Sequence, residues 1–583
     1  NSSQKNIAID VSDAARYVEN KGTINLNGIN SIGLKVSVGS EATNSGNIII
    51  NQGVDSLTQT ANYGIWSEGV GAITTQSGTV VLNGNGAIGI HARNKGMVSL
   101  EGNSEVEFSS GENQIGYFIY SAGSSINSKS TREQNVSTKG STLYRIDGGS
   151  SFVGSVDSIS SMKASGENST ILLVTGKSDD GKTISKLNTG KMVLNVNAEG
   201  ATAVKVEGGA QGVLDQGVLL ALTAKNATAG IVDGHSTTIT GAPGTSGASQ
   251  LTSYATLDNS NAASDAMGYI ARNKGTLIHK GSLIFTAENS TGVLVDGGNL
   301  ENSSEITVNG IAIDIIGGDS KVANTGTVKA TSGTAAYRLK DGASLALSGQ
   351  GTTIAQNVAH GVLIDVPSST ATAVSELTVT DATISVTGTG NAIENGAEVA
   401  GIRLVNAKLN VDQGAGIRSG AELGMSNSGV ITVSGSGAGI VLKHANGSSS
   451  TSDLNLLDSD GLTINVTGAN GTGIITNTSG EVKNGTAINV TANDGGSALV
   501  VGGTTTNVVQ SGKLTSSSTT KEVVNLNNGK VSTFTNNASI KANSSGQIAV
   551  ASNSGIGMIF TNSSGASIVG KVNLLTGDNI VNL

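Results

Sequence analysis

Two short patterns alternate along nearly the whole chain, and they constrain its fold more than any other feature. The first is a turn followed by a short alternating strand, as in NKGTINLNG at residues 20–28 and QSGTVVLNG at residues 76–84. The second is a glycine followed by another apolar strand, as in IGIHA at residues 88–92 and AGIVL at residues 438–442. Successive copies lie roughly 18 to 34 residues apart, which is the spacing of solenoid repeats.

These patterns predict short strands joined by tight turns. Each strand is roughly three to six residues long and rich in β-branched residues, and the Asn-x-Gly and Gly-Gly turns are expected to supply positive φ angles. No segment of about ten residues or more has a convincing helical period. We therefore predict an all-β chain folded as a right-handed parallel β-helix, a solenoid in which each coil lies on the coil below. At about 22 residues per coil it would have roughly 25 coils, and at about 4.8 Å per coil it would be a rod on the order of 120 Å long.

The composition fits a narrow, tightly paired solenoid. Aromatic residues make up 3% of the chain, and it has 2 prolines among 583 residues. A narrow interior excludes large rings, and a strand paired on both sides needs the N–H that proline lacks. Disorder is disfavoured because 37% of the residues are hydrophobic and the net charge is only −9. Several separate β-sandwiches are the alternative, but they need larger core residues and lack this repeat.

Charge and cysteine content exclude several classes of function. The isoelectric point is about 5.2 and no basic stripe is present, so we expect no nucleic-acid partner, which would require clustered Lys and Arg. The 0 cysteines exclude disulfides, zinc–thiolate sites and cysteine nucleophiles. No apolar run approaches the roughly 18 residues that a membrane-spanning helix requires.

One stretch fits the phosphate-binding loop pattern G-x-x-x-x-G-K-[ST], at residues 176–183. A functional loop of this kind needs a helix directly after Gly181, whose N-terminus would face the phosphates. The sequence instead returns to the repeat, with another strand at residues 192–196, and Asp179 and Asp180 would repel phosphate. We therefore interpret this stretch as a polar loop that joins two coils.

A second glycine-rich stretch, GNGAIG at residues 84–89, fits the dinucleotide-binding pattern but also lacks a following helix. Related stretches recur at the same place in the repeat, at residues 435–440 and 468–474. A cofactor site would not recur in many coils, so we predict no cofactor.

The sequence nominates no catalytic or metal-binding residue. None of the five histidines pairs with another at metal-ligand spacing; they are His91, His235, His279, His360 and His444. No G-D-S-G or G-x-S-x-G motif of a serine nucleophile occurs, and VDGHS at residues 232–236 is interpreted as a loop. Carboxylates such as Asp365, Glu394 and Glu398 could meet only across coils, and nothing in the pattern selects them. We predict that the chain is not an enzyme.

The aromatic residues are unevenly distributed, and this selects candidates for recognition. Of the 15 aromatic residues, 13 precede residue 341. Because aromatic residues supply much of the contact energy in recognition, we expect a recognition site in the N-terminal half. The candidate residues are Tyr63, Trp66, Tyr117, Phe118, Tyr120, Tyr144, Pro243 and Tyr254. The alternative is that several of these rings fill the N-terminal end of the helix.

Two further features bear on recognition. The repeat lapses near residues 121–168 and 233–266, which we interpret as loops extruded from one face, where solenoids often bind; flexible spacers are the alternative. The dense Asn, Ser and Thr at turns are expected to stack coil on coil into ladders facing solvent. Each such hydrogen bond adds only about 0.5–1.5 kcal/mol, so we expect binding through many weak contacts.

With both repeats in hand, the chain resembles the passenger domains of type V autotransporters, and most of all the AIDA-type and self-associating adhesins of Gram-negative bacteria. The resemblance implies secretion through an outer-membrane barrel, absent from this chain, and display on the bacterial cell surface as an extracellular protein. It also implies virulence-related cell adhesion, autoaggregation and biofilm formation. We expect an N-terminal cap at residues 1–20, where residues 12–20 could form a helical turn, and a β-helix passenger at 21–529. The resemblance implies that the C-terminal coils at 530–583 fall near the stable folding region of such passengers.

Three functions remain open at this point. The leading one is an adhesin that binds a host surface protein or glycan, or another copy of itself. The second is a polysaccharide lyase or hydrolase built on a β-helix, although no cluster of Asp ligands with a catalytic Arg or Lys stands out. The third is a binder of a soluble host protein.

Overall fold

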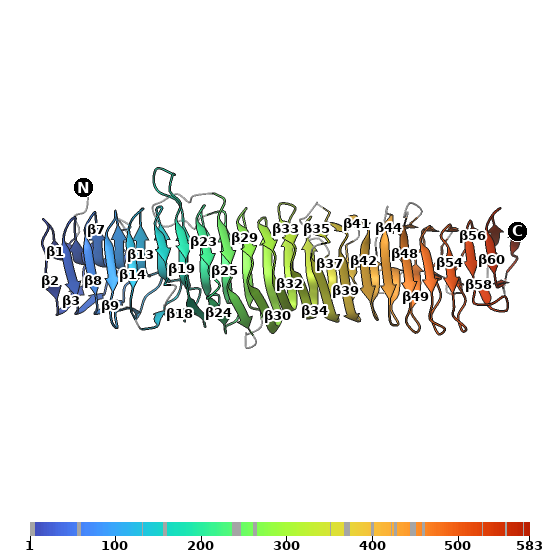
Figure 1. Ribbon diagram of the computed structural model, residues 1–583, viewed down its shortest axis with the longest axis horizontal. Helices are drawn as coiled ribbons and strands as arrows, with labels where there is room; N and C mark the ends of the chain where they lie inside the picture. Colours follow the sequence, from blue (N-terminus) through green and yellow to red (C-terminus); the bar gives the residue numbers. More distant parts are fainter. Residues whose placement is uncertain are drawn as a thin grey trace. The chain divides into compact units, whose positions relative to one another are not determined.

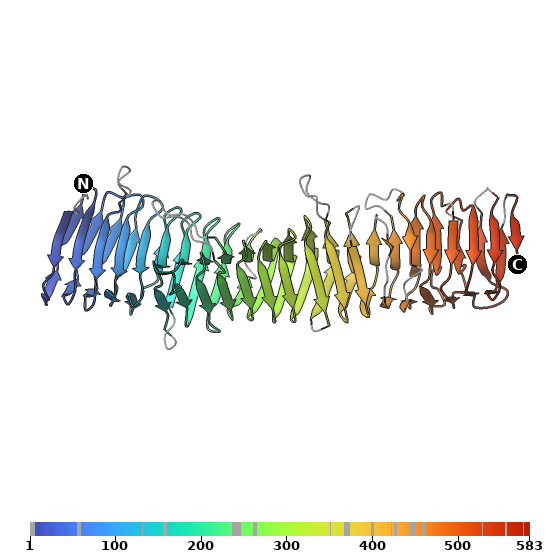
Figure 2. The ribbon, with the colours of Figure 1, turned by 90° about the horizontal axis from the view of Figure 1, so that it is seen from above.

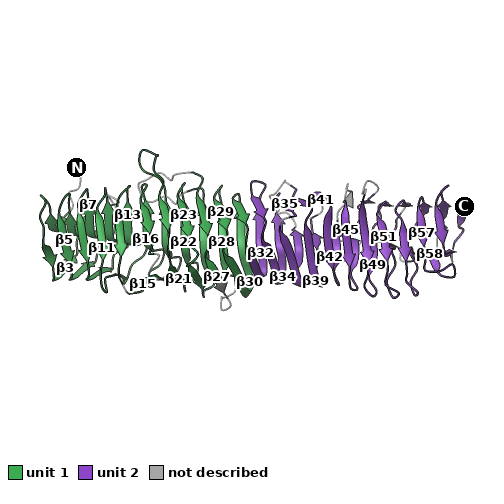
Figure 3. Ribbon diagram, in the orientation of Figure 1, with its two compact units in different colours: residues 1–305 green, residues 306–583 purple. Residues whose placement is uncertain are grey.

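A computed structural model describes most of the chain. The described residues are 6–54, 60–130, 132–155, 160–235, 247–259, 265–349, 351–365, 374–397, 401–420, 423–424, 428–443, 450–456, 461–505, 507–527, 529–553, 557–574 and 577–583. They divide into two compact units, residues 1–305 and 306–583 (Figure 3). No helix occurs among them, and so none is long and apolar enough to cross a membrane.

Unit 1 is a parallel β-helix with three strands per coil, one on each of three faces (Figure 1). Face 1 contains β1 (Asn6–Val11), β4 (Ser31–Val36), β7 (Tyr63–Glu68), β10 (Ile88–Arg93), β13 (Ile115–Tyr120), β16 (Thr142–Asp147), β19 (Thr170–Thr175), β22 (Thr202–Glu207), β25 (Thr228–Asp233), β28 (Met267–Arg272) and the second half of β30 (Ser282–Asp296). Face 2 contains β2 (Val18–Asn20), β5 (Glu41–Asn44), β8 (Ile73–Gln76), β11 (Met97–Leu100), β14 (Ser125–Ser128), β17 (Ser151–Val153), β20 (Lys186–Asn188), β23 (Gln211–Leu214), β26 (Gln250–Ser253), β29 (Thr276–His279) and β31 (Asn299–Asn302). Face 3 contains β3 (Thr23–Leu26), β6 (Asn47–Ile50), β9 (Thr79–Leu82), β12 (Glu105–Phe108), β15 (Gln134–Val136), β18 (Ser160–Ala164), β21 (Met192–Val196), β24 (Leu219–Leu222), β27 (Thr256–Asn259) and the first half of β30.

Unit 2 repeats this arrangement (Figure 2). Face 1 contains the second halves of β32 (Glu305–Ile316) and β34 (Thr327–Lys340), then β37 (His360–Ile364), β40 (Ile393–Asn395), β43 (Ala415–Ser419), β46 (Ala438–Leu442), β49 (Thr472–Asn477), β52 (Leu499–Gly502), β55 (Val524–Asn525), β58 (Ile548–Ser552) and β61 (Lys571–Leu574). Face 2 contains β33 (Lys321–Asn324), β35 (Ser344–Ser348), β38 (Glu376–Thr380), β41 (Gly401–Val405), β44 (Leu423–Gly424), β47 (Leu454–Asn455), β50 (Val482–Asn484), β53 (Asn507–Gln510), β56 (Thr533–Asn536), β59 (Ile559–Asn562) and β62 (Ile580–Asn582). Face 3 contains the first halves of β32 and β34, then β36 (Thr352–Asn357), β39 (Thr383–Gly388), β42 (Ala407–Val411), β45 (Gly429–Val433), β48 (Leu462–Val466), β51 (Ala487–Val490), β54 (Leu514–Ser516), β57 (Ser539–Lys541) and β60 (Ser567–Val569).

The prediction of an all-β parallel β-helix is confirmed in each unit. Several coils are longer than the repeat of about 22 residues that the pattern suggested, although Ala407 and Gly429, on successive coils, are 22 residues apart. Asn20 and Asn44, which stack on successive coils, are 24 residues apart, whereas Asn44 and Gln76 are 32 apart. The coils vary in length because the turns between faces vary, while the strands stay short.

The interior is built from the inward side of each strand. On face 1 of unit 1, Leu34, Ile65, Ile90 and Tyr117 lie in register on successive coils and are all buried. Burying one such large apolar side chain contributes about 1.5–3 kcal/mol. Because each inward residue stacks on its counterpart, every coil covers the core of its neighbour.

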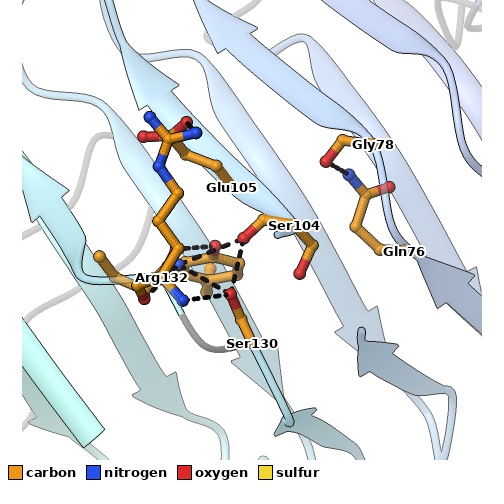
Figure 4. Close-up of polar contacts among 8 residues, drawn as sticks. Gln76, Gly78, Ser104, Glu105, Ser130 and Arg132 are labelled. Carbon is orange, nitrogen blue, oxygen red and sulfur yellow. Dashed lines mark hydrogen bonds and ion pairs between the residues drawn. The ribbon is translucent and has the colours of Figure 1, made fainter. Parts of the chain in front are cut away.

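A second element of the interior is a ladder of amide side chains, which we call the amide ladder. Asn20 Nδ2 donates to Asn44 Oδ1 at 2.6 Å, and Asn44 Nδ2 donates to Gln76 Oε1 at 2.8 Å. Gln76 Nε2 then donates to the Gly78 carbonyl at 2.8 Å (Figure 4). All three amides are buried. The expectation that such ladders face solvent is therefore wrong for these residues, because their side chains satisfy backbone groups inside the corner.

Other ladders do face solvent. Asn51 Nδ2 donates to Asn27 Oδ1 at 2.7 Å, and Asn83 Nδ2 donates to Asn51 Oδ1 at 2.8 Å, at exposed positions. In unit 2, Ser563 donates to Asn537 Oδ1 at 2.7 Å in the same exposed manner. The turn asparagines thus serve both the interior and the surface.

Two glycines of the Asn-x-Gly turns are needed for a different reason from the one predicted, whereas Gly190 and Gly429 have the predicted positive φ angles, of 59° and 132°. Gly46 and Gly78 do not have positive φ angles. A Cβ added at Gly46 would lie 2.0 Å from the Gly22 carbonyl oxygen, and one at Gly78 would lie 1.9 Å from the Gly46 oxygen. Close stacking of the coils therefore excludes a side chain. At Gly148 and Gly149, by contrast, φ is 64° and 81°, as predicted for a Gly-Gly turn.

Residues 121–168, where the repeat was expected to lapse into a loop, instead contain β14 to β18. Short polar contacts hold this stretch against the coil before it (Figure 4). Arg132 Nη1 lies 2.8 Å from Glu105 Oε2, and the Ser130 hydroxyl donates to the Ser104 carbonyl at 3.0 Å. Serine and charged residues conceal the apolar alternation here, but they occupy outward and turn positions.

The strands near both ends of the described chain pair in parallel with the neighbouring coils. The predicted cap at residues 1–20 contains β1 and β2, which already pair in parallel with β4 and β5. Residues 530–583 contain β56 to β62, which continue the three faces of unit 2. Nothing in the structure bears on a folding nucleus in this region.

The predicted loop at residues 233–266 is only partly described. Residues 236–246, which include Pro243, and residues 260–264 lie outside the described part. Between them, β26 and β27 pair in register with neighbouring coils on faces 2 and 3.

Candidate recognition surface

The outward side of face 1 in unit 1 brings several large side chains into one row. Trp66, His91, Phe118 and Arg145 occupy the same register position on β7, β10, β13 and β16. We call these four residues the ring row. They align because parallel in-register pairing places equivalent residues of successive coils directly beside one another.

The side chains of the ring row stack along the coils. The ring centroids of Trp66 and His91 are 4.9 Å apart, and those of His91 and Phe118 are 4.7 Å apart and nearly parallel. Tyr63, from the start of β7, lies 4.6 Å from Trp66 and 5.3 Å from His91. The guanidinium of Arg145 closes the stack, 5.4 Å from the centre of Phe118.

A second row, which we call the charged row, runs beside the first. It consists of Glu68, Arg93, Tyr120 and Asp147, again in register. Arg93 Nε lies 3.3 Å from Glu68 Oε1, and its guanidinium lies 5.5 Å from the Trp66 ring and 5.9 Å from the Tyr120 ring.

Hydrogen bonds and an ion pair tie the two rows together. Trp66 Nε1 donates to Glu68 Oε2 at 3.0 Å, and Arg145 Nη2 donates to Asp147 Oδ2 at 2.7 Å. Cation–π contacts of this kind are worth about 0.5–1 kcal/mol at exposed sites. The two rows therefore form one braced network.

A hairpin borders the charged row. It joins β19 to β20 and is closed by an antiparallel bridge between Lys177 and Ile184. This is the stretch that resembled a phosphate-binding loop. It is a polar loop, as the sequence predicts, but it joins two faces of one coil and not two successive coils. Tyr120 donates its hydroxyl to Asp179 Oδ1 at 2.9 Å, which docks the hairpin beside face 1. Burial, followed by the Asp179 carboxylate, raises the pKa of Tyr120 above its usual range.

The Gly-Gly turn makes room for this docking. A Cβ added at Gly149 would lie 3.0 Å from the Thr183 carbonyl oxygen, and one at Gly148 would lie 2.8 Å from Tyr120 Cε2. Within the hairpin, the Ser178 hydroxyl donates to Asp180 and lowers the pKa of that carboxyl group. Side-chain hydrogen bonds within the hairpin thus stabilise its conformation.

Four of the eight predicted recognition residues meet on this surface: Tyr63, Trp66, Phe118 and Tyr120. Tyr117 and Tyr144 do not, because both are fully buried, with stacked rings 4.4 Å apart inside the coil. Burial raises the pKa of both phenols, and Tyr117 donates to Gln134 Oε1 at 2.5 Å. They are core residues of internal coils, and not residues that fill the N-terminal end of the helix, as the alternative had it.

The last two predicted residues lie elsewhere. Tyr254 is 38% exposed in the turn between β26 and β27, with Lys280 Nζ 5.4 Å from its ring centre. Pro243 lies outside the described residues.

The sequence interpretation missed five members of the two rows: Glu68, His91, Arg93, Arg145 and Asp147. Aligning the strands YGIWSE, IGIHAR, IGYFIY and TLYRID would have found them. The fourth column of that alignment reads W, H, F, R, and the sixth reads E, R, Y, D.

The ring row is largely buried. Trp66 is 9% exposed, Arg145 is 7% exposed and His91 is 3% exposed, because each side chain is covered by its neighbours in the row. Among the described residues, no group of three or more His, Asp or Glu side chains could hold a metal ion. The arrangement is a network of aromatic rings, guanidinium groups and carboxylates that contact one another.

The remaining titratable candidates serve the fold. His279 is buried and its Nδ1 lies 2.7 Å from Asn302 Oδ1, and burial lowers its pKa. The Asn391 backbone N–H donates to His360 Nδ1 at 3.0 Å, and burial, followed by the Arg418 charge, lowers the pKa of His360 to about 4. Glu394 lies 2.9 Å from Arg418 Nη1, and burial raises its pKa.

The other predicted positions give no site. His235 donates its backbone N–H to Asp233 Oδ1 at 2.9 Å within a turn. His444 and Glu398 lie outside the described residues.

Comparison with known proteins adds no assignment. No protein-family model matches the chain, and no curated protein matches it.

Proposed function

We propose that this chain is an adhesin, displayed on a bacterial cell surface, which attaches cells to a host surface or to one another. The observation that carries the proposal is the ring row with its charged row. Large aromatic and arginine side chains, which dominate binding energy in most interfaces, align on one outward face of a regular solenoid. The repeat and its resemblance to autotransporter passengers support the same proposal.

The geometry favours binding over catalysis. The two rows lie on the outward side of a sheet and pack closely against one another, whereas enzymes bury most of a small substrate in a cleft. Their carboxylates are engaged by neighbouring arginine, tryptophan or tyrosine side chains. A solenoid that presents such rows suits an extended partner on another surface.

The test is a gain of adhesion. The full chain is displayed on a bacterial strain that neither aggregates nor attaches, and sedimentation and attachment to cultured cells are measured. We expect either property to appear with the displayed chain and to be absent with an unrelated β-helix displayed at equal density. If the displayed chain confers neither, the proposal is wrong.

A further inference from the structure

We propose that His279 makes the face 2 strands β26, β29 and β31 a pH-sensitive segment of unit 1, which opens locally when that histidine takes up a proton. The inference concerns the solenoid itself and does not depend on the proposed function. Three features carry it: the position of His279 in its coil, the tautomer that its neighbours impose, and the surroundings of its second ring nitrogen.

His279 occupies a corner position that other coils of unit 1 fill with amides. Ser253, His279 and Asn302 end β26, β29 and β31 and lie in register on successive coils. The residues of the amide ladder end β2, β5 and β8 in the same way. His279 is 0% exposed, and its two neighbours are buried as well. Because histidine, unlike an amide, changes its charge between about pH 5 and 8, this position places a titratable group inside the corner.

The neighbours of His279 select one neutral tautomer. Asn302 Nδ2 donates to the Ser304 carbonyl at 3.0 Å, and the Ser304 backbone N–H donates to Asn302 Oδ1 at 3.3 Å, so the orientation of this amide is fixed. Asn302 Oδ1 lies 2.7 Å from His279 Nδ1, and as a carbonyl oxygen it can only accept. The proton of the neutral ring is therefore on Nδ1, and an added proton would go to Nε2.

The second ring nitrogen of His279 is enclosed by the core. Within the part of the chain that the structure describes, Nε2 is buried and has no hydrogen-bond partner. The ring centroid of Tyr269 lies 5.8 Å from that of His279, and the Tyr269 hydroxyl is already hydrogen-bonded to Ser253 at 2.7 Å. A protonated ring would therefore hold a charge and an unpaired N–H inside the coil, and both are costly to bury.

The strands around His279 direct no charged side chain toward it among the described residues. The strands β25, β26, β28 and β31 pack against β29. The titratable side chain that they direct inward is the phenol of Tyr269, which is neutral at physiological pH. Asp233 and Arg272 pair with each other at 2.6 Å on the outward side of face 1, and Glu301 is exposed. No carboxylate is thus placed to stabilise an imidazolium at His279.

The linkage between protonation and opening follows from this burial. Burial lowers the pKa of His279 below its ordinary value of 6.5. The opened segment therefore takes up the proton at a higher pH than the closed one does. The contribution of His279 to the closed state is complete above about pH 6.5 and falls as the pH is lowered. Since the amides of the amide ladder do not titrate, opening should begin at β26, β29 and β31.

The test is hydrogen–deuterium exchange of the purified full chain at about pH 7 and about pH 4.5, with protection factors corrected for the intrinsic effect of pH on exchange. We expect protection in β26, β29 and β31 to fall by about tenfold or more relative to β5 and β8. Each pH unit between the pKa values of the open and closed states shifts the opening equilibrium about tenfold. His279→Asn and His279→Gln, which restore an amide at this position, should remove the difference. The matched control is His235→Asn, at an exposed histidine, which should respond as wild type.

The wild type alone can overturn the inference. Protection in β26, β29 and β31 that is unchanged at about pH 4.5, or that is lost equally in β5 and β8, would contradict a local segment controlled by His279. An equal loss in a folded amide variant, checked by its thermal midpoint at pH 7, would show that another group is responsible.

Discussion

The outward row of face 1 differs between the first coils of unit 1 and the coils of unit 2, although the backbone repeats. In the first coils of unit 1 the row contains Trp66, His91 and Phe118, with Trp66 edge-on to His91 and His91 stacked on Phe118. Later coils of unit 1 have Leu173, Lys205 and Ile231 in this column. In unit 2 the same column contains Glu394 paired with Arg418, followed by aliphatic residues: Val441, Ile475 and Val500. The interiors are alike, because both units bury amide and aliphatic ladders. The solenoid therefore fixes the spacing of the side chains in the outward column, while the residue types in that column vary from coil to coil.

A salt bridge in unit 2 should show the largest effect on stability. Arg338 holds Asp314 with two hydrogen bonds, of 2.9 and 2.6 Å, and the Asp314 side chain is only 6% exposed. Arg338→Ala would leave a buried charge alone, so we expect the free energy of unfolding in urea to fall by about 3 kcal/mol. The control is Lys182→Ala, which removes the exposed pair between Lys182 and Asp180 of the hairpin and should cause no measurable change. Equal losses of unfolding free energy in the two variants would show that burial does not make the Arg338–Asp314 pair more important to stability than the exposed pair.

Replacing both partners sharpens this prediction. In the double variant Asp314→Leu and Arg338→Met no buried charge is left unpaired, so most of the lost stability should return. A double variant as unstable as Arg338→Ala would mean that packing, not the charge, explains the loss.

The amide ladders provide the next comparison, between the interior and the surface of unit 1. Asn44→Ala removes a buried amide that bonds to both neighbouring coils, so we expect about 2 kcal/mol of destabilisation. Asn51→Ala, in the exposed ladder, should cost less than about 0.5 kcal/mol. Thermal and urea unfolding measure both variants. Equal costs would contradict the distinction between the two ladders.

The last comparison is a pH dependence in unit 2, where two groups titrate in opposite directions. Burial and the Arg418 charge lower the pKa of His360 to about 4, from 6.5. Because the unfolded chain takes up this proton first, the contribution of His360 to stability is complete above about pH 6.5 and is lost as the pH falls toward about 4. Glu394, whose pKa is raised, opposes this trend and gains stability on acidification. The wild type should therefore lose more stability than His360→Gln between pH 7 and about 4.5; parallel pH profiles would contradict this.

Much of the fold was predictable from the sequence, because the strand-turn repeat is a direct consequence of coil stacking. It was harder to predict which residues of each strand face the interior and which face outward. A Cβ at Gly116 would lie 2.9 Å from the Leu143 carbonyl oxygen and 3.0 Å from Phe108 Cζ, so this glycine faces the interior, as does Tyr117 after it. The glycine shifts the phase of the strand, and Tyr117 lies inside while Phe118 lies outside.

The candidate surface was predictable only in part. Aromatic content selected Trp66 and Phe118, but Arg93 and Arg145 become conspicuous only when the register is known. The docking of Asp179 on Tyr120, 59 residues apart, depends on coil lengths that follow no fixed period. Gly46 and Gly78 were recognised for the wrong physical reason, because a positive φ and a close approach select the same residue, whereas Gly148 and Gly149 have the predicted positive φ.

The most direct test of the central claim is the affinity of the purified chain for the cells to which the displayed chain attaches. Wild type is compared with the double variant Trp66→Ala and Phe118→Ala and with Leu363→Ala at the equivalent position in unit 2. We predict that the double variant loses about tenfold or more in affinity, with a thermal midpoint still well above the assay temperature, while Leu363→Ala binds as wild type. Unchanged binding by a folded double variant, or an equal loss in Leu363→Ala, would show that the ring row is not the recognition surface.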